Sequence, residues 1–270
     1  MKITFIGGGN MATALIGGLK KQGFSAAGIQ VVEPVAEARE QLTESFGVRC
    51  TPTMDAAALS CEVLVLAVKP QQMKEALTPA AGKLSNQLVI SIAAGLRLAD
   101  IGRWLGGYTR LIRAMPNTPA LIGVGISGLY ADPTVDREGN IVAEKILAAV
   151  GRTLWIEDEA LMDVVTAVSG SGPAYVFYFI ESLQNAGTGL GLPPETARLL
   201  AVETFLGAAR LAEASNDPVN VLRERVTSKG GTTAAALDAF AAADIAAAIA
   251  KGVAAAAARG REMCDQLGKS

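Results

Sequence analysis

The chain has 270 residues, of which 50% are hydrophobic and 19% are charged. It is therefore too long for one minimal core and too apolar for a disordered protein. The formal net charge is −2, and no long run of lysine and arginine occurs, which argues against a nucleic-acid partner. Histidine is absent, so the commonest general base and metal ligand are unavailable, and no metal site is expected.

The sequence predicts a cytoplasmic protein without a membrane span. Its first residues pass from one lysine into a short apolar strand and a glycine turn, without the hydrophobic region of a signal peptide. The longest apolar stretches are built from alanine and are interrupted by Asp244 and Lys251. Three widely separated cysteines fit reduced thiols better than a disulfide framework.

Short β-branched runs alternate with helical stretches in the first half of the chain, which predicts an α/β fold with a parallel sheet. The expected strands are Lys2–Ile6, Ile29–Val32, Val63–Val68, Leu88–Ile92 and Thr109–Ala114. Two further strands, Gly123–Tyr130 and Arg152–Ile156, flank a helix at about Asp136–Val150. We therefore expect a first domain at residues 1–157.

The first strand runs directly into Gly7-Gly8-Gly9-Asn10-Met11-Ala12, which matches the dinucleotide-binding pattern G-x-G-x-x-A. In this pattern Gly7 permits the tight turn and Gly9 lets the main chain approach a pyrophosphate. Ala12 allows close contact between helix and strand, and Asn10 and Met11 open a helix whose amides favour an anion. The first domain is therefore expected to be a Rossmann-type domain that binds NADPH or NADH.

Glu33 follows the second strand, where a carboxylate usually accepts hydrogen bonds from the adenosine ribose. Such a carboxylate would favour NADH, because it repels a 2′-phosphate. Two alternatives stay open: Glu33 could merely cap a loop, and Arg39 could pair with a phosphate. The sequence leaves the choice between the two cofactors undecided.

Two more loops follow expected strands at the carboxyl edge of the sheet, where ligands of such sheets bind. The third strand ends in Ala67, Val68, Lys69 and Pro70, where the small residues leave room for the cofactor. Lys69 either contacts a phosphate or is only solvated. Asn117 lies between two prolines after the fifth strand, in a rigid loop that either borders the nicotinamide or only braces the crossover.

Strand patterning stops after residue 157, so residues 158–270 are expected to form an all-helical domain. The expected helices are Ala160–Ala186, Pro194–Ala214, Pro218–Val226 and Thr232–Leu267. Residues 232–258 are largely alanine, which predicts close helix packing, including packing between subunits. A permissive surface helix would have the same composition.

A loop between two of these helices is the best candidate substrate site. It contains Ser228, Gly230, Gly231, Thr232 and Thr233, and so combines hydroxyl groups, paired glycines and a helix N-terminus. Main-chain amides in such a loop can bind a carboxylate. The alternative is an ordinary helix cap with glycine spacers.

Several segments together resemble the pyrroline-5-carboxylate reductase family. The likeness covers nearly the whole chain, in Gly7–Ala12, Ala67–Pro70, Met115–Pro119, Ser169–Ala174, Asp217–Leu222 and Val226–Leu237. One departure is Lys229, where many relatives carry proline. The resemblance implies an N-terminal Rossmann-type sheet and a C-terminal all-helical dimerisation domain that also binds substrate.

The same resemblance implies NAD(P)H-dependent reduction of 1-pyrroline-5-carboxylate to L-proline, the last step of proline biosynthesis, by a homodimer or a higher homo-oligomer. It places the substrate carboxylate on the Ser228–Thr233 loop, the Thr233 hydroxyl beside the ring nitrogen, and Asn117 near the nicotinamide. Hydride must reach carbon and a proton must reach nitrogen. Without histidine, the proton comes from solvent, a hydroxyl group or a protonated substrate, and Thr233 orients the ring.

Two other classes of protein share part of this pattern. β-Hydroxyacid dehydrogenases share the two-domain plan and need a lysine four residues after the second glycine of the first interdomain helix and an asparagine four residues later. This chain has Val176 and Ile180 at those positions. A non-catalytic dinucleotide sensor is the other alternative, but it does not need the hydroxyl-rich loop.

Overall fold

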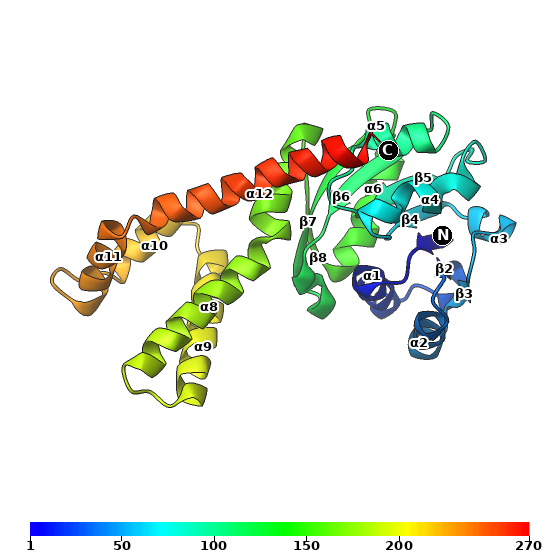
Figure 1. Ribbon diagram of the computed structural model, residues 1–270. Coiled ribbons are helices and arrows are strands. Elements are labelled where there is room, and N and C mark those ends of the chain that lie inside the picture. The colour runs from blue at the N-terminus through cyan, green and yellow to red at the C-terminus, as the bar shows by residue number, and fades with distance from the viewer. Residues whose placement is uncertain (270) are drawn as a thin grey trace. The chain divides into compact units, whose positions relative to one another are not determined.

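The computed structural model describes residues 1–269, which divide into two compact units (Figure 1). The first unit comprises Met1–Ser171 together with Ala256 and the residues after it, and the second comprises Gly172–Ala255. The first unit thus ends after Ser171 and not at the expected residue 157. The added segment belongs there because Met162, Asp163 and Ala167 are buried within this unit.

The first unit contains an eight-stranded sheet with the order β3-β2-β1-β4-β5-β6-β7-β8. The strands are β1 (Ile3–Ile6), β2 (Ile29–Val32), β3 (Arg49–Thr51), β4 (Val63–Leu66), β5 (Leu88–Ser91), β6 (Leu111–Met115), β7 (Gly125–Ala131) and β8 (Gly151–Trp155). Seven of them overlap expected strands. The edge strand β3 was missed because it has three residues, none of them fully buried.

The sheet is predominantly parallel, as expected, and it contains one antiparallel pair. Strands β1 to β6 run parallel, whereas β6 pairs antiparallel with β7, and β7 pairs parallel with β8. Only residues 116–124 connect β6 to β7, and a parallel pair needs a crossover of about a dozen residues or more. The short connection therefore reverses the chain.

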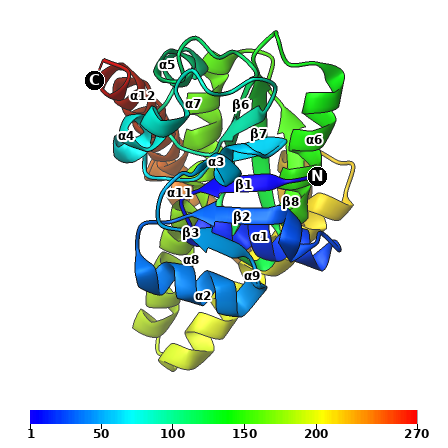
Figure 2. The ribbon, with the colours of Figure 1, turned by 90° about the vertical axis from the view of Figure 1, so that its right-hand side faces the viewer.

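Helices cover both faces of the sheet. Helices α1 (Asn10–Lys21), α2 (Ala36–Phe46) and α6 (Arg137–Leu147) contribute to one core, whereas α3 (Ala56–Leu59), α4 (Met73–Leu77) and α5 (Leu98–Trp104) contribute to the other. Alternate residues of one strand serve the two cores: Val65 faces the first and Leu66 the second. Figure 2 shows β1, β2 and β3 side by side with α2 close to β3.

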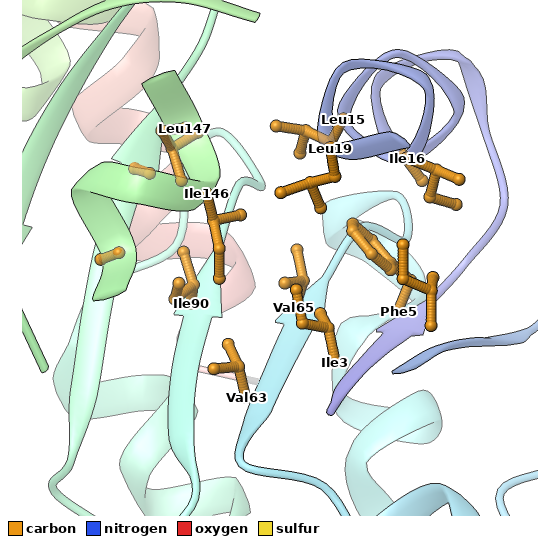
Figure 3. Packing of buried hydrophobic residues seen from close by; sticks show 14 of the residues in the cluster. Ile3, Phe5, Leu15, Ile16, Leu19, Val63, Val65, Ile90, Ile146 and Leu147 are labelled. Atoms are coloured by element: carbon orange, nitrogen blue, oxygen red, sulfur yellow. The ribbon is translucent and has the colours of Figure 1, made fainter. Parts of the chain in front are cut away.

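Large apolar side chains fill the first core. Leu15 and Leu19 of α1 point toward the strands, and Ile146 of α6 approaches the side of Ile90 (Figure 3). Gly18 of α1 is needed for this packing, because a Cβ there would lie 2.3 Å from the carbonyl oxygen of Ala149. The close approach holds the C-terminal half of α1 against the turn Ala148–Val150.

The first unit also contains α7 (Met162–Val165), followed by a π-helical turn at Thr166–Gly170. The second unit contains α8 (Gly172–Gly189), α9 (Pro194–Ala214), α10 (Val219–Arg225) and α11 (Thr232–Ala242). Helix α12 (Ile245–Leu267) begins in the second unit, and its C-terminal part belongs to the first. The expected helix Ala160–Ala186 is therefore interrupted by the π-helical turn.

The expected helix Thr232–Leu267 is also divided in two. Helices α11 and α12 are bent by 55°, and Asp244 between them has φ 53°, which a helix does not accommodate. The alanine-rich composition predicted helix on both sides but gave no signal for this break. Among residues 1–269, no single helix is long and apolar enough to cross a membrane, although α11 and α12 together pass that test by length and composition.

Candidate functional site

The glycine turn after β1 is open to an anion. Gly7 has φ 97°, and a Cβ there would lie 2.8 Å from the carbonyl oxygen of Ala67, so only glycine fits. Gly9 is the exposed N-cap of α1, with no side-chain cap and no acidic residue in the first turn. The first amides of α1 therefore lack an internal partner, as a pyrophosphate site requires. Ala12 is buried against the sheet.

The strand order brings the other predicted cofactor residues to the same edge. Because β1 lies between β2 and β4, Glu33 and Ala67 flank the glycine turn. Backbone hydrogen bonds of 2.8 Å join Gly7 N to Val32 O and Ala67 N to Ile6 O. This edge is the topological switch point of the sheet, where such folds bind nucleotides. A dinucleotide fits the residues that meet here.

The loop after Ala67 forms the far border of this edge. Val68 is partly buried against the second core, and the exposed Lys69 precedes a short 3₁₀ turn that starts at Pro70. Strand β4 already ends at Leu66, so the expectation that Pro70 stops the strand is wrong, and Pro70 instead starts the turn. Lys69 therefore presents its ammonium group to solvent, and its contact with a phosphate stays a prediction.

The side chain of Glu33 is fixed by two backbone amides. Its Oε2 accepts a hydrogen bond of 2.9 Å from Gly8 N, and its Oε1 accepts one of 2.9 Å from Val35 N. Arg39 Nη1 donates to the carbonyl oxygens of Glu33 at 2.9 Å and of Pro34 at 2.7 Å. The carboxylate thus lies against the glycine turn, and Arg39 closes the loop that carries it.

Asn117 has a structural role that the sequence did not reveal. Its Oδ1 accepts a hydrogen bond of 3.0 Å from Ile126 N of β7, and its Nδ2 donates one of 3.3 Å to Ser169 Oγ. Both ends of the amide are therefore used to join the loop after β6 to β7 and the π-helical turn. The expected fixed orientation is present, and the nicotinamide contact stays a prediction.

The Ser228–Thr233 loop of the second unit shares its main features with the glycine turn of the first unit. Gly230 has φ 72°, and Gly231 is the N-cap of α11, again without a side-chain cap or an acidic residue in the first turn. A Cβ at Gly231 would lie 2.5 Å from Ser228 Oγ. The amides of Thr232 and Thr233 belong to the first turn, where a helix offers no backbone acceptor. This arrangement suits a small carboxylate.

Comparisons with known proteins find matches to both halves of the chain. A family model described as pyrroline-5-carboxylate reductase dimerisation matches residues 159–263, and one described as NADP oxidoreductase coenzyme F420-dependent matches residues 2–95. The pyrroline-5-carboxylate reductase of Pseudomonas aeruginosa is 45% identical over 99% of this chain and 98% of the relative. The chain belongs to the pyrroline-5-carboxylate reductase family.

Solved structures of this family have the same fold. The pyrroline-5-carboxylate reductase of Coxiella burnetii superposes with a TM-score of 0.90 at 41% identity and covers 97% of this chain and 98% of its own. The Plasmodium falciparum enzyme, solved with NADP bound, has a TM-score of 0.87 at 29% identity and covers 98% of both chains. The predicted fold class, a Rossmann-type sheet followed by a helical dimerisation domain, is confirmed.

A buried ionic cluster in the first unit was not found by sequence reasoning. Arg113 of β6 and Asp163 of α7 are joined at 2.9 Å, and Glu159 lies 3.5 Å from the same guanidinium group. Cys264 of α12 donates to Asp163 at 3.7 Å, and its burial raises the pKa of its thiol. A lone arginine in the apolar strand Leu111–Met115 was the available signal.

This cluster anchors the C-terminal end of α12 within the first unit. Next to it, Arg97 pairs with Asp265 at 2.7 Å, and a Cβ at Gly95 would lie 2.9 Å from Met263 Cβ. The strand that carries Arg113 leads into the loop of Asn117, so the cluster supports one border of the cofactor edge. Among the described residues, no three histidine, cysteine or acidic side chains are grouped to hold a metal ion.

Proposed function

We propose that this chain reduces 1-pyrroline-5-carboxylate to L-proline with NADPH or NADH, in the last step of proline biosynthesis. The observation that carries the proposal is the uncapped start of α11, where Gly230 and Gly231 leave amides free for a carboxylate beside the Thr233 hydroxyl. Family membership supports the reaction, since relatives that are 45% and 47% identical to this chain are named pyrroline-5-carboxylate reductase.

The first unit would bind the cofactor, which supplies the hydride when bound. The amides of Asn10 and Met11 face the pyrophosphate, while Gly7 and Gly9 let it approach. Glu33 accepts hydrogen bonds from the adenosine ribose.

The other border of the cofactor site would be formed by the loops after β4 and β6. Ala67, Val68 and Pro70 border the cofactor, and Lys69 reaches toward phosphate. Asn117 holds the loop beside the nicotinamide through Ile126 and Ser169.

The loop before α11 would bind the imine. Ser228, Gly230, Gly231 and Thr232 hold the carboxylate through amides and hydroxyl groups. The Thr233 hydroxyl orients the ring nitrogen, either by donating a hydrogen bond to a neutral imine or by accepting one from the N–H of an iminium. Because the chain contains no histidine, the proton that nitrogen gains comes from solvent, from a hydroxyl group or from a substrate that is already protonated to an iminium. Positioning then accounts for most of the rate enhancement.

We further propose that the enzyme is a homodimer or a higher homo-oligomer. The match of residues 159–263 to a dimerisation domain supports this, as do exposed apolar side chains such as Phe177 and Leu211 in the second unit. Cys50, Cys61 and Cys264 are free thiols, which fits the reducing conditions of the cytoplasm.

The decisive experiment measures cofactor oxidation with pyrroline-5-carboxylate and, separately, with a hydroxyacid. Only the imine is expected to consume reduced cofactor. Thr233→Val removes the hydroxyl at similar volume and should lower turnover roughly 10- to 10³-fold, the range for one orienting donor. Thr233→Ser keeps the hydroxyl and is the matched control.

Two outcomes would contradict the proposal. If the wild-type protein binds the cofactor but never reduces the imine, the chain is a sensor and not a reductase. If Thr233→Val turns over at the wild-type rate while remaining folded, Thr233 has no part in the mechanism, and the carboxylate loop must act through its amides alone.

A further inference from the structure

We infer that Glu33 makes this chain discriminate between its two cofactors, with NADH bound more tightly than NADPH. The inference rests on the proposed function, because it concerns the same cofactor site. It follows from three features of the first unit. The Glu33 carboxylate is held in place, it lies at the glycine turn, and the cationic side chain nearest to it in sequence already forms other hydrogen bonds.

The first feature is the rigidity of the Glu33 carboxylate. Gly8 N and Val35 N each donate to a different oxygen at 2.9 Å, so both oxygens are held and the group cannot rotate freely. A Cβ at Gly8 would lie 3.4 Å from both Cγ and Oε2 of Glu33, which shows how closely the side chain packs on the turn. Hydrogen bonds to a charged acceptor are stronger than neutral ones.

The second feature is position. Glu33 follows β2 and adjoins the turn after β1, and in this fold the adenosine ribose lies between these two elements. Two amides use two of the roughly four acceptor sites of a carboxylate, so acceptors remain for ribose hydroxyl groups. A 2′-phosphate would instead bring a charge of about −1.5 to −2 against the carboxylate.

The third feature is the state of Arg39, the cation nearest in sequence. Its Nη1 already donates to the carbonyl oxygens of Glu33 and Pro34, at 2.9 and 2.7 Å. These bonds brace the loop that carries the carboxylate. To reach a 2′-phosphate with this nitrogen, Arg39 would have to give up both bonds and release the loop.

The expected size of the preference follows from Coulomb's law. A phosphate dianion about 6 Å from a carboxylate, in surroundings as polar as water, is repelled enough to change a dissociation constant about tenfold. Less polar surroundings increase the factor. We therefore expect the dissociation constant of NADPH to exceed that of NADH by about tenfold or more.

The test is a titration of the purified full chain with each cofactor in the absence of imine. The fluorescence of the cofactor reports binding. Glu33→Gln removes the charge and retains an amide oxygen, so NADPH binding should tighten about tenfold while NADH binding changes less. Glu37→Gln is the matched control, because Glu37 lies in the first turn of α2 and is exposed. It should leave the ratio of the two constants unchanged.

Arg39→Ala separates the two roles of the arginine. If Arg39 only braces the loop, its removal should weaken the binding of both cofactors by the same factor. It should also lower the melting temperature of the cofactor-free protein. A loss confined to NADPH would make Arg39 a phosphate ligand and overturn the inference. The melting temperature of Glu33→Gln, measured in the same way, reports whether its turn stays folded.

The remaining outcomes are equally distinct. If the wild-type chain binds NADPH as tightly as NADH and still reduces the imine, the inference is overturned and the proposed function stands. If neither cofactor binds, the proposed function itself fails. If Glu33→Gln leaves the ratio unchanged in a folded protein, the preference does not arise from the carboxylate.

Discussion

The two units of this protein bury their apolar side chains to different extents. In the first, helices on both faces of the sheet bury large side chains such as Phe5, Leu15 and Leu66 completely. In the described residues of the second, Ala197 and Ala201 are the fully buried hydrophobic side chains, whereas Phe177 is 67% exposed and Leu211 is 70% exposed. The first unit is a complete core within one chain, and the second requires a partner surface.

The binding loops follow the same division. The glycine turn is held by neighbouring strands, since Gly7 bonds to Val32 and packs on Ala67. The Ser228–Thr233 loop is shaped by its own residues, through the bond of 3.0 Å from Gly231 N to Ser228 O. We therefore expect cofactor binding to depend on the first unit alone. Because the unit that carries the second loop leaves large apolar side chains exposed, we expect substrate binding to depend on the assembled oligomer.

The largest expected effect is in the first unit. Arg113→Ala leaves Asp163 buried without its partner, which should lower the free energy of unfolding by about 3–5 kcal/mol. Urea unfolding measures this loss. Arg97→Ala breaks an exposed pair and should cost only about 0.2–1 kcal/mol. Equal losses in the two variants would show that burial of the pair is unimportant.

The second prediction concerns the exposed face of the second unit. Leu211→Glu should weaken self-association roughly 30-fold, the effect of losing one central interface residue. Sedimentation at several concentrations measures the change. Ile141→Glu is the control, because Ile141 is 55% exposed on α6 in the first unit. Cofactor binding should persist in both variants, and its loss with dissociation would contradict the division described above.

The smallest expected effect is a pH dependence at the start of α6. The Gly139 amide, and then Arg110, hold the pKa of Asp136 below its usual range. A lowered pKa in the folded state means that the stabilisation is complete above the unfolded pKa of about 3.9 and is lost as the pH falls through the folded value. Asp136→Ala should therefore have a lower melting temperature than the wild-type protein at neutral pH. The difference should disappear as the pH falls below the folded pKa of Asp136.

Asp136→Asn separates the two contributions at this position. Asparagine can still cap α6 through Gly139, but it cannot form the ion pair of 3.1 Å with Arg110. Its melting temperature should lie between those of the other two proteins at neutral pH. A difference between the wild-type protein and Asp136→Ala that stays constant with pH would exclude a charged contribution.

Sequence reasoning located features that depend on local patterns. Residues 63–66 and 88–90 are all apolar, so the two strands that contain them were predicted within a few residues. It failed where local signals were weak or contrary. Strand β3 is short and partly exposed at the edge of the sheet, and the alanines around Asp244 favour a helix that the chain interrupts.

The candidate site shows the same limit. Gly7, Glu33 and Ala67 were expected at one edge, and β1, β2 and β4 bring them there. The pairing of Asn117 with Ser169 was not predicted, because 52 residues separate them and neither residue type specifies the other. The two amide bonds that fix Glu33 also depend on how its loop closes.

By itself, the sequence determined the alternation of strands and helices and the two glycine-rich helix starts. The periodic pattern of apolar residues and the positive φ of Gly7 and Gly230 each depend on only a few neighbouring residues. They can therefore be predicted from the sequence. Only the tertiary structure decided that β7 reverses, that Arg113 pairs with Asp163, and that Cys264 joins them from the last helix. Those contacts join residues far apart in the chain, and their energy depends on burial that no local pattern encodes.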